Sequence, residues 1–88
     1  MTIGEILEEQ RKALGFSLEQ MKGIIKAKNA NWLWSIEKDK SKIPVKSIEN
    51  FRKSYRLPHS FSIEVLKEQR SEYYDLFKAV LKNVVNDL

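Results

Sequence analysis

The chain of 88 residues fits one small domain, contains no cysteine and carries a net charge of +4. The lack of cysteine excludes disulfides, thiolate zinc sites and thiol nucleophiles, and it suits the reducing cytoplasm, where we expect the protein. No apolar run approaches the roughly 20 residues that span a bilayer, and the first residues lack the order of a secretion signal, so we expect no membrane partner.

The positive charge is concentrated in the middle of the chain. Residues 26–58 contain nine Lys or Arg against three Asp or Glu, whereas residues 1–25 and 59–88 each carry one more acidic than basic residue. A block of this kind is expected of a surface that meets phosphates. A solvated, lysine-rich face is the alternative interpretation.

The first 25 residues predict two short helices. Thr2 with Glu5, and Ser17 with Gln20, each have the capping-box spacing, in which two side chains bond each other's backbone N–H groups at a helix start. Apolar residues at helical spacing follow each box, and Gly15 can end the first segment. We expect the second helix to be barely two turns long.

A third helix is predicted after a polar bridge at residues 26–29. Asn29 is a natural N-cap, and an apolar stripe at helical spacing follows it. The helix should stop near Asp39. Residues 40–44 should form an extended connector, because the residue before Pro44 is pushed out of helical geometry.

A fourth helix is predicted from the apolar spacing of Ile48, Phe51 and Tyr55, and it should end before Leu57 and Pro58. No strand pattern interrupts these segments. The sequence therefore predicts an all-α fold.

Beyond residue 58, Ser60 or Ser62 can cap a final helical region, which is either one helix of about 26 residues or two helices joined near Ser71. Its apolar band is wider than a lone surface helix needs. The band can pack on the first four helices or form a homodimer, and we expect the homodimer. The expected dimerisation residues are Tyr73, Phe77, Val80, Leu81, Val84 and Leu88.

Two short helices joined by a tight turn on a basic chain form the helix-turn-helix device, whose second helix lies in the major groove of DNA. Residues 3–17, 36–41 and 43–57 resemble segments of the Xre-type regulators, the Cro- and lambda-repressor-like class. The run EKDKSKI at residues 37–43 is similar to the N-terminal domain of the Rgg/MutR branch. The resemblance covers residues 2–58.

This resemblance implies an all-α, five-helix, lambda-repressor-like DNA-binding fold. Residues 1–58 would form the helix-turn-helix domain, and residues 59–88 a C-terminal helical extension that packs or dimerises. It also implies a sequence-specific transcriptional regulator of bacterial or phage type, with duplex DNA as its partner. The residues that it turns toward the groove are Lys28, Asn29, Asn31, Trp32 and Ser35.

The third helix has an inner and an outer side. At about 100° per residue, Asn31, Ser35 and Lys38 point outward, Trp34 lies at their edge, and Trp32 falls on the opposite flank, where it can cover the core. Asparagine can bond bidentately to adenine, and an exposed aromatic ring can lie against thymine methyl groups. Lysines after the helix would border the phosphate backbone. The candidate DNA-binding residues are Ser17, Lys28, Asn29, Asn31, Trp32, Trp34, Ser35, Lys38, Lys40 and Lys42.

Three departures from the family pattern leave a second function open. Leu18 stands where the class often has a DNA-contacting glutamine, and Asp39 stands in place of a frequent turn glycine. The third helix has no arginine, the commonest reader of guanine. The alternative is a protein-interaction module, such as an antirepressor or repressor cofactor that kept the scaffold. A small basic bundle of the bacteriocin-immunity kind is a third possibility.

An enzyme is not indicated. His59 is the only histidine, and no Gly-rich phosphate loop or paired metal-ligand motif accompanies it. The carboxylates are interpreted as members of ordinary surface pairs, such as Glu8 with Lys12. We therefore expect no catalytic residue, no metal ion and no cofactor.

Overall fold

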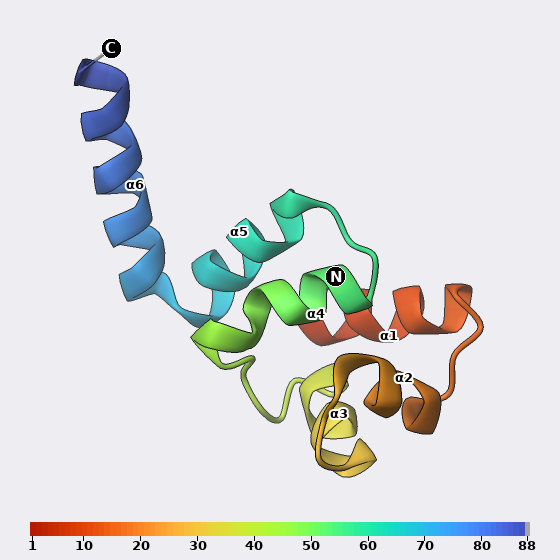
Figure 1. The fold of residues 1–88 in the computed structure, drawn as a ribbon. Helices are drawn as coiled ribbons and strands as arrows, with labels where there is room; N and C mark the ends of the chain where they lie inside the picture. Colours follow the sequence, from red (N-terminus) through yellow and green to blue (C-terminus); the bar gives the residue numbers. More distant parts are fainter. Residues whose placement is uncertain (88) are drawn as a thin grey trace.

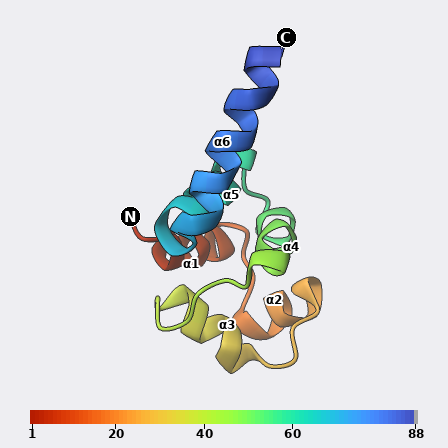
Figure 2. The ribbon, with the colours of Figure 1, turned by 90° about the vertical axis from the view of Figure 1, so that its left-hand side faces the viewer.

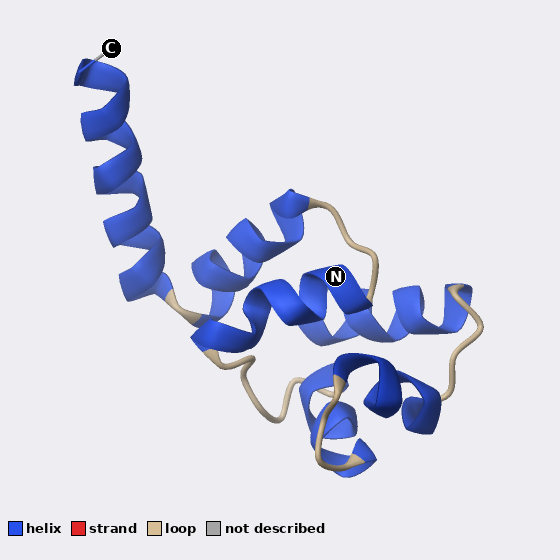
Figure 3. Ribbon diagram, viewed as in Figure 1, coloured by secondary structure: helices blue, strands red, loops and turns tan. Residues whose placement is uncertain are grey.

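The computed structural model describes the backbone of residues 1–87 and the side chains of residues 1–83 (Figure 1). Every regular element of this part is helical, as Figure 3 shows, which confirms the all-α prediction. The helices are α1 (Ile3–Ala13), α2 (Leu18–Ile25), α3 (Ala30–Glu37), α4 (Ile48–Ser54), α5 (His59–Gln69) and α6 (Ser71–Asp87), and a 3₁₀ turn, η1 (Val45–Ser47), precedes α4.

Both predicted capping boxes are present and set the starts of α1 and α2. The Thr2 hydroxyl accepts the backbone N–H of Glu5 at 3.1 Å, and the Glu5 carboxylate accepts that of Thr2 at 3.0 Å. Ser17 and Gln20 repeat the arrangement at 3.1 and 2.8 Å. Gly15, after the end of α1, has a φ of 81°, a left-handed conformation that glycine adopts without strain.

The turn between α2 and α3 is also local in origin. Lys26 ends α2 in the left-handed region with φ 61°, and the Asn29 side chain accepts the backbone N–H of Trp32 at 2.8 Å, as expected of an N-cap. The chain thus turns within four residues, and α3 packs against α2 (Figure 2).

Helices α1 to α5 enclose one apolar core. It includes the stripes predicted for the third and fourth helices, and it extends to α5 through Phe61 and Val65. Phe51 lies at its centre, with its ring stacked on Tyr55 at 5.8 Å and meeting the edge of Trp32 at 5.6 Å between centroids. The buried apolar residues are Ile3, Leu7, Met21, Ile25, Leu33, Ile36, Ile43, Ile48, Phe51, Tyr55, Phe61 and Val65.

A buried ion pair runs through this core and corrects the expectation that the carboxylates lie on charged surfaces. Glu37 is only 2% exposed. Arg11 donates to its carboxylate from Nε at 2.9 Å and from Nη2 at 3.0 Å, and the Tyr55 hydroxyl donates to it at 2.8 Å. Burial and the adjacent Glu37 carboxylate raise the pKa of Tyr55. The network ties α1, α3 and α4 together.

A second contact between α1 and α3 explains Gly4 and Asp39. A Cβ atom at Gly4 would lie 2.3 Å from the carbonyl oxygen of Glu37, so only glycine permits this approach. Asp39 has a φ of 59°, where a glycine would be unstrained, but its carboxylate accepts the backbone N–H of Gly4 at 2.9 Å and the hydroxyl of Thr2. The Asp39 side chain therefore accepts a backbone N–H of the first turn of α1 that has no partner within the helix, and a glycine at position 39 could not do so.

The last helical region consists of two helices, which answers the question that the sequence left open. The first of them, α5, begins at His59 after Pro58, so the expectation that Ser60 or Ser62 caps it is wrong. Pro58 itself is the N-cap, with an extended backbone (φ −72°, ψ 165°), and no side chain caps the helix. Ser62 lies inside α5 and donates to the carboxylate of Glu49 on α4.

The chain bends between α5 and α6 at Arg70. Its guanidinium donates to the carbonyl of Ile43 at 3.1 Å, and the backbone N–H of Ile43 donates to the side-chain oxygen of Gln69 at 2.8 Å. The connector after α3 therefore holds the end of α5. We expected a domain boundary at residue 58, before α5. Phe61 and Val65 of α5 belong to the same core as the first four helices, and the chain leaves that core only after Arg70.

Helix α6 projects away from the other helices in both views (Figures 1 and 2) and lengthens the molecule to 46 Å, against 24 and 22 Å in the other directions. The described part of its apolar band, up to Leu81, therefore does not pack on the first four helices. Tyr73, Leu76, Phe77, Val80 and Leu81 are between 40% and 62% exposed. The side chains of the other two expected dimerisation residues, Val84 and Leu88, lie outside the described part. None of the described helices combines the length and apolarity that a membrane crossing requires.

Candidate nucleic-acid interface

The outer side of α3 carries polar groups that the fold does not use. Asn31 is exposed and Ser35 is half-buried, and in the described part neither side chain forms a hydrogen bond. The backbone carbonyl of Ser35 accepts the N–H groups of Lys40 at 2.8 Å and Ser41 at 3.2 Å, which holds the connector against the end of the helix. An amide and a hydroxyl are thus available to an external ligand.

The two tryptophans of α3 have different surroundings. Trp32 is partly buried with its ring against Phe51, so it covers the core, as its place on the wheel predicts. Trp34 is 37% exposed, and the Lys40 ammonium lies 5.0 Å from the centroid of its ring. This cation–π contact helps to hold the Trp34 ring in place on the surface.

Trp34 forms one wall of a shallow hollow between α2 and α3. The other walls are Leu18, at the start of α2, and Ala30 and Asn31, at the start of α3. Ser17 caps α2 directly before Leu18, and its hydroxyl accepts a backbone N–H there. The sequence singled out Leu18 as a departure from the family pattern, but helical periodicity within each segment could not bring it to Ala30, because they lie on different helices.

A second hollow borders the other flank of α3, where Lys26, Lys28 and Asn29 surround the outer side of Trp32. The Asn29 oxygen caps the helix, and its amide nitrogen forms no hydrogen bond within the described residues. Lys26 was not among the expected contact residues. Its left-handed backbone places it in the turn, next to Lys28, and its position in the polar bridge was the only sequence signal for it.

Two of the expected DNA-binding lysines are placed differently from expectation. Lys38 forms an ion pair with Glu8 of α1 at 2.9 Å, because the C-terminal end of α3 lies against α1. Lys42 lines a hollow with Thr2 and Glu68, near the start of α1 and the end of α5.

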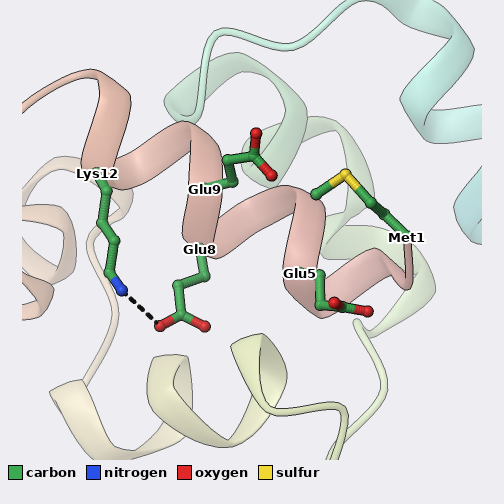
Figure 4. Close-up of a pocket in the computed structure, with 5 residues that line it drawn as sticks. All are labelled: Met1, Glu5, Glu8, Glu9 and Lys12. Atoms are coloured by element: carbon green, nitrogen blue, oxygen red, sulfur yellow. Dashed lines mark ion pairs between the residues drawn. The ribbon is translucent and has the colours of Figure 1, made fainter.

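The exposed side of α1 carries a group of acidic side chains (Figure 4). Glu5, Glu8 and Glu9 line a hollow there, and Lys12 bonds Glu8 at 3.1 Å, which confirms that expected pair. Hydrogen bonds from Lys38 and Lys12 lower the pKa of Glu8, so this carboxylate is charged at neutral pH. Glu5 and Glu9 form no ion pair with a described residue, so their charges repel phosphates, in contrast to the lysine-bearing turn before α3.

Within the described residues, no group of three His, Asp or Glu side chains is placed to hold a metal ion. Comparison with protein families, with curated proteins and with solved structures finds no match to this chain.

Proposed function

We propose that this protein binds duplex DNA and regulates transcription, with α2 and α3 acting as a helix-turn-helix of the Xre, lambda-repressor-like type. The observation that carries the proposal is the unused polar side of α3, where the Asn31 amide is exposed beside a basic turn. Lys26, Lys28 and Lys40 form no ion pair with any described residue, so their charges are available to phosphates.

The dimensions support the same function. An α-helix with its side chains is about 10–12 Å across and the major groove of B-DNA is about 12 Å wide, so a short helix such as α3 can enter the groove. In this arrangement α2 crosses the backbone, and the lysines around the turn neutralise phosphates. Phosphate contacts fix the register, while Asn31 reads a base edge.

DNA binding should be salt-dependent and should depend on Asn31. We expect the affinity for duplex DNA to fall steeply between 50 and about 200 mM salt, because bound lysines release counterions. On a site selected from a random duplex library, Asn31→Ala should cost about 1–3 kcal/mol, which is the discrimination that one bidentate base contact provides. Fluorescence anisotropy of labelled duplex measures both effects.

Asn83→Ala is the matched control, because Asn83 is an exposed amide on α6, far along the chain from α3. It should leave affinity unchanged. A protein that binds no duplex at micromolar concentration in low salt would contradict the proposal and would favour the protein-interaction module instead.

We further propose that α6 pairs with α6 of a second copy to form a homodimer. Tyr73, Phe77, Val80 and Leu81 lie along one side of this helix and are exposed, and an apolar strip of this kind is seldom left in water. To read two half-sites one helical turn of DNA apart, such a dimer requires its two copies of α3 to lie about 34 Å apart.

Charge placed on this strip should dissociate the dimer. Phe77→Glu should convert a dimeric species to a monomer in sedimentation equilibrium, because burying an unpaired carboxylate between two helices is costly. Ala79→Glu is the control, since Ala79 lies about 200° around the helix from Phe77 and is exposed. A wild-type chain that is monomeric at high micromolar concentration would refute the assembly.

A further inference from the structure

We propose that the hollow lined by Leu18, Ala30, Asn31 and Trp34 receives the 5-methyl group of thymine, so that the half-site contains an A·T pair at this position. The adenine of that pair would be bonded by Asn31. This inference rests on the proposed binding of duplex DNA and specifies which base pair the same surface reads.

The apolar walls come from two helices that the fold holds rigidly together. Leu18 is the first residue of α2, and the Ser17 capping box fixes its position. Ala30 and Trp34 are four residues apart and therefore lie on the same side of α3. Ala30, with the smallest of these side chains, lines the hollow together with Leu18 and Trp34.

The polar rim suits a base edge. Asn31 lies in the wall of the hollow, and its amide has no other hydrogen bond within the described residues. In the major groove an A·T pair offers N7 and N6 of adenine, which match an asparagine amide, together with the methyl group of thymine. Only A·T pairs combine these features in unmodified DNA. An amide beside an apolar hollow is complementary to this combination.

The charges around the hollow fit a phosphate-bearing ligand. The Lys40 ammonium lies 5.0 Å from the centre of the Trp34 ring and holds a positive charge at the rim. Glu19, the nearest acidic residue along the chain to Leu18, is paired with Lys22 at 3.2 Å, which offsets its charge. An acidic rim would repel phosphates and an uncharged rim would not attract them, so either would favour a ligand other than DNA.

The test removes the methyl group alone. After a binding site is selected from a random duplex library, each thymine is replaced in turn by deoxyuridine, and the dissociation constant of each duplex is measured. At one position in the half-site the wild-type protein should lose about fourfold in affinity, which corresponds to one buried methyl group. Trp34→Ala and Leu18→Ala should reduce this ratio to about one.

Ile24→Ala is the control, because Ile24 is an exposed apolar residue of α2 that does not line the hollow. It should keep the fourfold ratio. Binding with equal affinity for thymine and deoxyuridine at every position would overturn this inference and leave DNA binding intact. The same holds for a ratio that survives both Trp34→Ala and Leu18→Ala. If no duplex is bound or no sequence is enriched, the proposed DNA reading fails as well, and the hollow is left for a protein partner.

Discussion

Arg11→Met should lower the free energy of unfolding by about 3–5 kcal/mol, the largest effect that we expect of any single substitution. The reason is that Glu37 would remain buried as a carboxylate with only the Tyr55 hydroxyl to bond it. A domain of 88 residues has roughly 4–13 kcal/mol of stability, so this loss would be a large part of the total. Urea denaturation followed by tryptophan fluorescence measures it.

The control lies next to Arg11 on the same helix. Lys12 is 65% exposed and pairs with Glu8 on the surface, so Lys12→Met should change stability by less than about 1 kcal/mol. The two substitutions remove the same charge and introduce the same residue. The difference between their free energies of unfolding therefore reports the effect of burying the ion pair.

A triple variant separates two contributions to stability: the cost of burying the Glu37 carboxylate without Arg11, and the net contribution of the whole network of Arg11, Glu37 and Tyr55. Arg11→Met, Glu37→Met and Tyr55→Phe together remove every polar group of the network, and this variant should recover most of the stability that Arg11→Met loses. If the single and triple variants are equally destabilised, packing around Arg11 rather than the unpaired carboxylate is responsible, and our explanation is wrong.

Gly4→Ala should destabilise the fold by about 1–3 kcal/mol. The new Cβ would lie 2.3 Å from the carbonyl oxygen of Glu37 and 2.8 Å from a carboxylate oxygen of Asp39, so α1 and α3 would have to move apart. The movement would also strain the hydrogen bond from Gly4 to Asp39 at the start of α1. Thermal unfolding followed by circular dichroism measures the loss.

Gly23→Ala is the matched substitution and should have the opposite sign. A Cβ at Gly23 meets nothing within 4 Å, and alanine is favoured over glycine in a helix interior by roughly 0.5–1 kcal/mol. We therefore expect Gly23→Ala to raise the unfolding temperature. Equal effects of the two alanines would show that the close approach at Gly4 is not a constraint.

The starts of α1, α2 and α3 could be predicted from the sequence because their causes are local. A capping side chain and the N–H group that it satisfies lie three residues apart, as for Thr2 and Glu5, so short-range spacing is enough. The division of the last helical region could not be predicted. Arg70 ends α5 partly through a bond to Ile43, which is 27 residues away in the chain.

The candidate site divides in the same way. The outward direction of Asn31 follows from the periodicity of one helix, and the sequence placed it correctly. The pairing of Lys38 with Glu8 depends on how close α3 comes to α1, and Gly4 permits that approach. Lys38 was therefore expected among the phosphate-contacting lysines, although its ammonium is held by a carboxylate 30 residues earlier.

By itself, the sequence determined the helical class, the starts of α1, α2 and α3, the side of α3 that faces solvent and the basic character of the chain around it. Each of these follows from residues within a few positions of one another. Only the tertiary structure decided that Glu37 is buried, that Leu18 and Trp34 share one hollow, and that α6 leaves its apolar side uncovered. Those features depend on the distances between helices, which side-chain packing across the core sets. Such distances cannot be predicted from the spacing of residues that are close in the sequence.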